Sequence, residues 1–306
     1  MQLSVIICTH RPRVDYLKRV FISLRSQSLP LEEWEFLLVD NASPEPLAAT
    51  VDVSWHPRGR IVREDKAGLT HARFRAVAET TADTLVFIDD DNVPADDYLE
   101  KSKEIFASNP MIGCVSGDIR GEYETPPPEW FKGEYESWIA VRQIEKDTFS
   151  NFWHPRSEPC GAGMVVRRAV LLAMISSRKG SKLILDRSGS SLLSGGDVEI
   201  LHKAMDMGYL VGQVSALKMN HLIPSRRVST EYLFQLYRNI CASGLIVSAN
   251  RSCLPPAFPG LGKLAKEIGN MLFKPRPENR MAWERIRSHF LARRLYHDFL
   301  KSAPLP

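Results

Sequence analysis

The first 110 residues alternate short apolar runs with segments of helical periodicity, and this alternation leaves few possible folds. The runs at 3–8 (LSVIIC) and 84–88 (TLVFI) are rich in β-branched residues, as is typical of strands buried on both faces. Between them, the segments 15–26 and 69–80 carry apolar residues at helical spacing. Strands that alternate with helices form βαβ units, so we expect an α/β fold whose mostly parallel sheet is flanked by helices. Further strands are predicted at 36–39, 60–62 and 159–166, and further helices at 95–108, 197–207, 230–245 and 281–300.

Polar residues follow three of the predicted strands. Thr9 comes directly after the first, Asp40 after the second, and the acidic run 89–91 after the strand at 84–88. In open α/β sheets, ligands bind beyond the carboxyl ends of the strands. These residues are therefore expected to line one crevice.

Three consecutive carboxylates, Asp89, Asp90 and Asp91, repel one another unless positive charge lies among them. A hard divalent cation with oxygen ligands, Mn²⁺ or Mg²⁺, would supply that charge and share its site with substrate phosphates. The other interpretation is a solvated acidic turn that caps the next helix. The trio alone leaves both open.

The composition is that of a globular protein. The chain has 306 residues, of which 44% are hydrophobic and 25% charged, and it contains no apolar run of the roughly 18 residues that a membrane span needs. The N-terminus lacks the basic start and long apolar stretch of a signal peptide. Five scattered cysteines without a CxxC pair indicate reduced thiols, so a cytoplasmic location is expected.

Positive charge is concentrated near the C-terminus. Residues 255–306 hold ten Lys or Arg and four Asp or Glu, an excess of six, whereas the whole chain carries only +4. The predicted helix at 281–300 is amphipathic and basic. This pattern suggests peripheral contact with an anionic membrane or a phosphorylated acceptor. A solvated helical face is the alternative.

Four ordered blocks of sequence resemble the family 2 glycosyltransferases. They are LSVIICTHRPR (3–13), LLVDNASP (37–44), KAGLTHARFRAVAETTADTLVFIDDDNVP (66–94) and SGGDVEILHKAMDMGYLVG (194–212). The resemblance covers about 1–225 and implies a GT-A fold, with a Rossmann-like nucleotide-binding half at 1–117 and an acceptor-binding half at 118–225. Residues 226–306 would then form a helical, basic C-terminal extension.

The resemblance also implies roles for individual residues. Asp91 would ligate Mn²⁺ or Mg²⁺, with His221 as a second metal or phosphate contact, although a lone His is often structural. The run 72–76 lacks the Asn and Gly that usually follow the Ala-Arg pair of the family, which puts a local backbone contact in doubt but not Arg73. The residues implied to bind the nucleotide sugar are Thr9, Arg11, Asp40, Arg73, Asp89, Asp90 and Arg226.

Asp197 matches the general base of the family. It lies at a predicted helix start, where the helix dipole stabilises a negative charge, and the preceding glycines allow an acceptor to approach closely. Gly196 stands where an acidic neighbour is frequent, which leaves Asp197 as the plausible base. Its alternative role is that of a helix N-cap.

The implied function is inverting transfer of a hexose from a nucleotide-diphosphate sugar, expected to be UDP-linked, to a saccharide or lipid-linked acceptor in polysaccharide biosynthesis. No nucleic acid partner is expected. A sugar nucleotidyltransferase would need a glycine-rich loop after the first strand, and 8–12 contains no glycine. A non-catalytic carbohydrate-binding protein is the other alternative. Aromatic residues within 118–160, among them Trp130, Trp138 and Trp153, could stack on acceptor sugars or form ordinary core.

Overall fold

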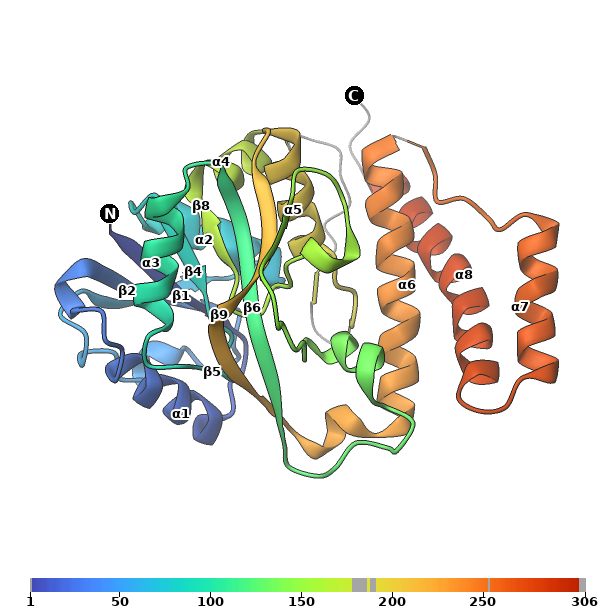
Figure 1. The fold of residues 1–306 in the computed structure, drawn as a ribbon, viewed down its shortest axis with the longest axis horizontal. Coiled ribbons are helices and arrows are strands. Elements are labelled where there is room, and N and C mark those ends of the chain that lie inside the picture. The colour runs from blue at the N-terminus through green and yellow to red at the C-terminus, as the bar shows by residue number, and fades with distance from the viewer. Residues whose placement is uncertain (1, 178–185, 188–190, 253, 303–306) are drawn as a thin grey trace. The chain divides into compact units, whose positions relative to one another are not determined.

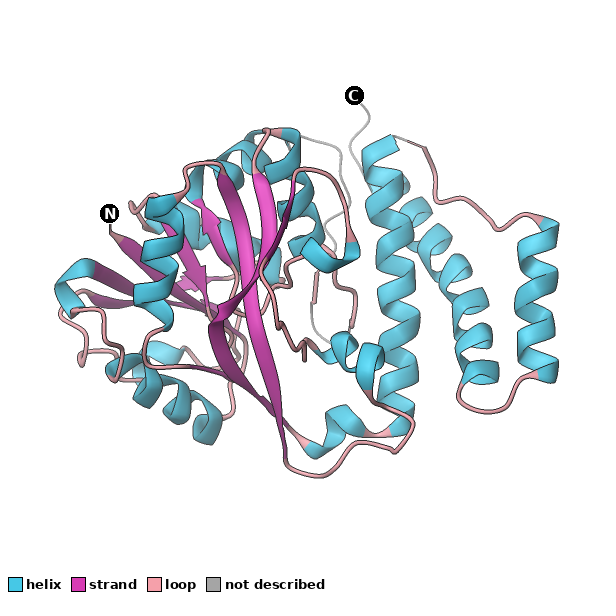
Figure 2. Ribbon diagram, in the orientation of Figure 1, coloured by secondary structure: helices cyan, strands magenta, loops and turns pink. Residues whose placement is uncertain are grey.

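The computed structural model describes residues 2–177, 186–187, 191–252 and 254–302. Their strands form one mixed sheet in the order β3-β2-β1-β4-β8-β6-β9-β5, with β7 paired to β9 (Figure 2). The strands are β1 (Leu3–Thr9), β2 (Trp34–Asn41), β3 (Gly59–Glu64), β4 (Thr84–Phe87), β5 (Asn92–Pro94), β6 (Ile112–Tyr123), β7 (Thr148–Ser150), β8 (Val165–Arg167) and β9 (Leu210–Ile223).

The predicted βαβ units form the parallel part of this sheet, in which β1 pairs with β2 and β4, and β2 pairs with β3. Side chains alternate between the two faces of each strand. Val5 and Ile7 accordingly lie in one apolar core and Ile6 lies in the other. This double burial explains why β1 reads as a continuous apolar run.

Helices cover both faces of the sheet. One core contains apolar residues of α1 (Val14–Arg25) and α3 (Tyr98–Ser108). The other contains residues of α2 (Leu69–Glu79), α4 (Arg168–Ser177) and α5 (Gly196–Asp206). The predicted helices in this part of the chain are thus confirmed, with shifted ends, and α4 is additional.

Beyond β4 the sheet is no longer uniformly parallel. β8 runs antiparallel to β4 and β6, while β6 and β9 are parallel to each other and lie side by side as two long strands (Figure 1). The strand predicted at 159–166 is wrong in its first part, because β8 begins only at Val165. The segment before it turns at Gly163, whose φ is +65° and whose carbonyl accepts a hydrogen bond of 2.5 Å from the Tyr98 hydroxyl.

The long strand β9 carries a period-two pattern that the prediction missed. Leu217 and Met219 are buried, whereas Lys218 and Asn220, which alternate with them, are exposed. A strand with polar residues on one face contains no continuous apolar run, so a search for such runs does not detect it. A short antiparallel partner, β5, pairs with its end through Asn92 and His221.

The chain forms two compact units. The first comprises 1–124, 140–177 and 197–223 and holds the whole sheet. The second comprises 125–139, 178–196 and 224–306. Its last segment begins near the predicted boundary at 225/226, and it also contains the aromatic loop at 125–139. The predicted division of 1–225 into a nucleotide-binding and an acceptor-binding half stays a prediction.

The second unit is helical. It contains α6 (Thr230–Ser252), α7 (Leu261–Phe273) and α8 (Glu278–Ser302), and α8 packs against both of the others (Figure 1). The predicted helices at 230–245 and 281–300 are confirmed and are longer, while α7 is additional. No helix in the described part of the chain is long and apolar enough to cross a membrane. The cysteines at 8, 114, 160 and 241 form no disulfide, and Cys253 lies outside the described residues, as does the end of the basic segment at 303–306.

Candidate active site

The strand ends meet as the sequence predicts. In the parallel pair of β1 and β2, Thr9 lies opposite Asp40. The Thr9 hydroxyl also donates a short hydrogen bond to a carboxylate oxygen of Asp90, which follows β4. The parallel order brings the carboxyl ends of β1, β2 and β4 to one edge of the sheet. Three predicted site residues therefore lie together there, although the first and the last are 81 positions apart in the sequence.

Asp40 is buried and already hydrogen-bonded. Its carboxylate accepts the backbone N–H groups of Ser43 at 3.1 Å and Leu47 at 3.0 Å, and a guanidinium N–H of Arg63 at 2.9 Å. Burial by itself would raise the pKa of Asp40, but these hydrogen bonds and the charge of Arg63 lower it below its usual 3.8. Asp40 thus orders the loop after β2 as an ionised group; its predicted contact with a nucleotide base stays a prediction.

The acidic run lies in the turn between β4 and β5. Asn92 donates its backbone N–H to the carbonyl of Asp89 at 3.1 Å, and Leu222 donates to the carbonyl of Asp91 at 2.8 Å. The second bond belongs to the contact of β5 with β9, which places Nε2 of His221 3.4 Å from Oδ2 of Asp91. Two predicted metal ligands, 130 positions apart in sequence, are therefore adjacent.

The Asp91–His221 pair suits a hard divalent ion. Carboxylate oxygen and imidazole nitrogen both ligate Mn²⁺, and such ions take further ligands from phosphates and water. Both side chains are largely buried, so their orientation is held by the protein. Among the residues that the structure describes, no group of three or more His, Cys, Asp or Glu is arranged to hold a metal. The pair could thus supply only part of a coordination shell, with substrate oxygens completing it.

Asp197 lies in the first turn of α5 and faces the loop before β8. Its Oδ2 accepts the backbone N–H of Gly161 at 3.0 Å, and its Oδ1 accepts the N–H of Val198 at 2.9 Å. Arg73 of α2 reaches the same place. A Cβ atom on Gly161 would lie 2.9 Å from Nη2 of Arg73 and 3.3 Å from Oδ2 of Asp197. The predicted base and the predicted nucleotide-pocket arginine are therefore neighbours across one glycine.

Sequence reasoning missed two members of this neighbourhood. Gly161 falls within the strand predicted at 159–166, whereas in the structure its backbone N–H holds Asp197 and its lack of a side chain leaves room for Arg73. Glu158 lies in the same loop. Burial raises the pKa of Glu158; the positive charge of Arg142 opposes this rise, and the negative charge of Asp197 adds to it. The glycine in the run Glu158–Pro159–Cys160–Gly161 was the available signal, because a glycine inside a predicted strand often marks a place where a ligand or another backbone approaches closely.

The two other predicted arginines are not brought to these groups by any described contact. Arg11 is exposed in the loop after β1, where it adopts φ of +53° and donates its N–H to the Ser43 hydroxyl at 3.1 Å. The loop after β1 is therefore joined at Ser43 to the loop after β2 that Asp40 orders. Arg226 lies in the short helix Ser225–Val228 of the second unit.

The aromatic residues of the loop 125–139 pack mainly on one another and on α6. Trp130 stacks on Phe234 with ring centroids 5.1 Å apart, and Trp138 stacks on Tyr237 at 4.6 Å. Of the two interpretations of these tryptophans, the contacts favour core. Trp153, which is 55% exposed in the first unit, keeps a face that a sugar could contact.

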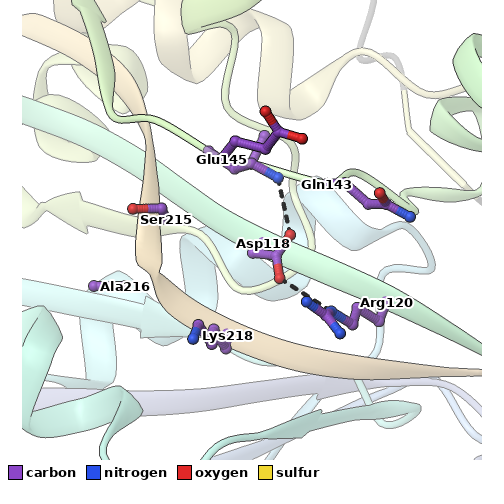
Figure 3. Close-up of a pocket in the computed structure, with 8 residues that line it drawn as sticks. Asp118, Arg120, Gln143, Glu145, Ser215, Ala216 and Lys218 are labelled. Carbon is purple, nitrogen blue, oxygen red and sulfur yellow. Dashed lines mark hydrogen bonds and ion pairs between the residues drawn. The ribbon is translucent and has the colours of Figure 1, made fainter.

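A cavity of about 480 Å³ lies elsewhere in the first unit, lined by residues of β6, of β9 and of the segment 143–145 (Figure 3). Asp118 stands at its centre, where its carboxylate accepts the N–H of Ile144 at 2.9 Å and that of Arg120 at 3.4 Å. Lys218 and Glu145 also line it. No predicted site residue does, so this cavity is separate from the strand-end site.

Comparisons with known proteins identify the family and the fold of this chain. A family model described as glycosyl transferase family 2 matches residues 4–172, more than half of the chain. No curated protein matches by sequence. Among solved structures, S. aureus TarS 1–349 is similar at 14% identity with a TM-score of 0.53, and its complex with UDP-GlcNAc at 13% with 0.56; both cover 100% of this chain and 93% of the other.

A longer structure of S. aureus TarS is similar at 14% identity with a TM-score of 0.53, covering 97% of this chain and 55% of that one. This protein therefore spans about half the length of the longer TarS chain. The shared fold confirms the expected GT-A type of α/β architecture with its helical C-terminal region. With the family model matching the segment that holds Thr9, Asp40, Arg73 and the acidic run, the chain belongs to glycosyl transferase family 2 and is a glycosyltransferase.

Proposed function

We propose that this protein is an inverting glycosyltransferase that moves a hexose from a nucleotide-diphosphate sugar to a hydroxyl group of a saccharide or lipid-linked acceptor. The observation that carries the proposal is the fixed carboxylate of Asp197 beside the guanidinium of Arg73. Family membership limits the reaction to glycosyl transfer, and the carboxylate supplies a group able to take the acceptor proton.

The donor would lie along the carboxyl ends of β1, β2 and β4. Thr9 and Asp90 offer a hydroxyl and a carboxylate there, both able to bind ribose or base, and Arg73 offers a cation for phosphate. One of the similar structures is titled as a complex with UDP-GlcNAc, which makes a UDP-linked sugar the first donor to test. Arg11, in the loop after β1 and hydrogen-bonded to Ser43 of the loop that Asp40 orders, would contact the nucleotide from the edge of that site.

Asp91 and His221 would hold a divalent ion, Mn²⁺ or Mg²⁺. When bound there, the ion supplies positive charge that stabilises a departing diphosphate. The two side chains would contribute one carboxylate oxygen and one imidazole nitrogen, and the pairing of β5 with β9 orients both. Their 3.4 Å separation supports a shared cation.

Asp197 would act as the general base. Its carboxylate takes the proton of the acceptor hydroxyl as that oxygen forms a bond with the anomeric carbon. The bond from this carbon to the diphosphate oxygen breaks, and the nucleoside diphosphate leaves with the electron pair. Attack opposite the leaving group inverts the anomeric configuration. Hydrogen bonds from Gly161 and Val198 hold the carboxylate in place, so it needs no reorganisation during transfer.

A donor screen tests this function. The purified protein is incubated with Mn²⁺ and a panel of UDP-, GDP- and dTDP-linked sugars, and released nucleoside diphosphate is measured. We expect release from one nucleotide class, suppressed by a chelator. Binding of a nucleotide sugar with neither hydrolysis nor transfer to any saccharide would favour the non-catalytic alternative. Pyrophosphate release from a nucleoside triphosphate and a sugar phosphate would favour the nucleotidyltransferase.

A further inference from the structure

Helix α7 presents a row of large apolar side chains to solvent. Leu261 is 87% exposed, Leu272 64% and Ile268 39%. They follow one another at intervals of seven and four residues, which places them on one face of a helix. Phe273, at the end of α7, is 86% exposed. We call these four residues the apolar face of α7.

This face is exposed because α7 packs on α8 through a different side. Glu267 is buried in that contact and accepts a hydrogen bond of 2.9 Å from Arg285 of α8. Glu267 lies one residue before Ile268, and adjacent helical positions point about 100° apart. The buried ion pair thus fixes the rotation of α7 so that Leu261, Ile268 and Leu272 face outwards.

The segment before α7 adds aromatic surface. Phe258 and Phe290 of α8 make an edge-to-face contact with ring centroids 5.2 Å apart, and they are 39% and 59% exposed. Arg293 lies over the Phe258 ring at 5.7 Å. Exposed aromatic rings beside arginine are typical of surfaces that enter the interface of a lipid bilayer.

The charge that faces solvent in this segment is almost entirely positive. Two of its four acidic residues are buried in ion pairs, Glu267 with Arg285 and Glu284 with Arg238, Arg280 and Arg287. Within the described residues 255–302, Asp298 is the exposed acidic side chain and Glu278 is half-buried. The exposed basic residues are Lys263, Lys266, Lys274, Arg276, Arg287, Arg293, Arg294 and Lys301.

We infer that the apolar face of α7, with its neighbouring lysines, docks the protein on an anionic lipid surface. The apolar side chains enter the boundary between headgroups and acyl chains, while Lys263, Lys266 and Lys274 reach the acidic headgroups. The sequence pointed to 281–300 for this contact. In the structure, α8 packs against both α6 and α7, so we assign the lipid-binding surface to α7 instead.

Charge argues for lipid and against a second copy of this chain. Two copies joined through α7 would bring their lysines together, and like charges across an interface oppose association. An anionic bilayer neutralises the same lysines. Peripheral docking would also hold the enzyme where a lipid-linked acceptor lies, but it does not depend on the proposed transfer reaction.

Vesicle flotation tests the inference. The full chain is mixed with vesicles of phosphatidylcholine alone or of phosphatidylcholine with phosphatidylglycerol. We expect recovery with the anionic vesicles and little with the neutral ones. Ile268→Gln with Leu272→Gln, and separately Lys263→Glu with Lys266→Glu, should each lower the partition coefficient about tenfold or more. All four side chains are exposed, so the melting temperature should not change.

Matched controls lie on α1 of the first unit. Ile22 is 62% exposed and Lys18 is exposed, so Ile22→Gln and Lys18→Glu change the same chemistry elsewhere and should float like the wild type. Equal recovery with both vesicle types, or unchanged flotation of the α7 variants, would overturn the inference. The inference would also be overturned if light scattering showed a dimer of the wild type and a monomer of the α7 variants. Donor hydrolysis without vesicles is measured in parallel, so failure of docking and failure of the proposed reaction are told apart.

Discussion

The backbone N–H of Gly161 donates a hydrogen bond of 3.0 Å to Oδ2 of Asp197, and these residues are 36 positions apart. The bond ties the start of α5 to the loop that precedes β8. It holds the proposed base in a fixed orientation without using another side chain. Arg73 reaches the same glycine from α2, so three elements of the first unit meet at one backbone position.

Replacing the proposed base tests its role. Asp197→Asn should lower transfer by about 10²–10⁴-fold with donor affinity nearly unchanged, because the amide cannot accept a proton and the side chain keeps its shape. Asp197→Ala should lower transfer similarly. Turnover and nucleotide binding by titration calorimetry are measured for both. If Asp197 serves only the helix start, Asn would keep most activity and Ala would chiefly lower the melting temperature.

Removal of one metal ligand should weaken donor binding. Asp91→Asn deletes a charged oxygen ligand, and we expect Mn²⁺-dependent binding of nucleoside diphosphate to fall tenfold or more, on the order of 1.4 kcal/mol. His221→Gln should act in the same direction. Calorimetry with and without Mn²⁺ gives the metal-dependent part of the affinity. Unchanged Mn²⁺ dependence in Asp91→Asn would contradict the assignment.

Two neighbouring glycines should respond differently to alanine. At Gly161 the new Cβ would meet the end of the Arg73 side chain at 2.9 Å, which can shift, so turnover should drop while thermal stability changes little. At Gly163, φ is +65° and the Cβ would meet Met219 Cε at 2.1 Å and the Tyr98 hydroxyl at 2.6 Å. Gly163→Ala should therefore lower the melting temperature strongly. Equal effects of the two changes on both measurements would show that Gly161 has no special place in the site.

The stability of the fold should fall as the pH drops, because acid protonates a buried histidine, His56. Burial, with the charge of Arg58, lowers the pKa of His56 from 6.5 to about 4, and its Nδ1 accepts the Arg58 N–H at 3.1 Å. The unfolded chain binds a proton at His56 below pH 6.5, whereas the folded chain binds it only near pH 4. Folding stability is therefore full above pH 6.5 and falls by on the order of 3 kcal/mol as the pH drops to 4.

His56→Asn provides the comparison, because its side-chain oxygen can still accept the Arg58 N–H. Urea unfolding of both proteins between pH 4 and 7 gives the difference in slope. We expect the free energy of unfolding of the variant to depend less on pH in this window. Parallel pH profiles for the two proteins would mean that other groups carry the acid sensitivity.

The sequence by itself determined the parallel part of the fold and the family. The runs at 3–8, 36–39 and 84–88 are apolar on both faces, which only a covered sheet can satisfy, and polar residues at their ends predict a site at one edge. Local patterns of this kind are visible along the chain. They correctly placed Thr9, Asp40 and Asp90 together.

The tertiary structure decided what no local pattern encodes. The pairing of β5 with β9 brings Asp91 to His221, and β9 itself was hidden because its outer face carries polar residues. The place of Gly161 beside Asp197 depends on a turn before β8, and a backbone N–H has no sequence signature. On α7, the outward rotation of the apolar face follows from the buried Glu267–Arg285 pair. Contacts between distant segments set these features, so they follow from packing and hydrogen bonding and not from periodicity.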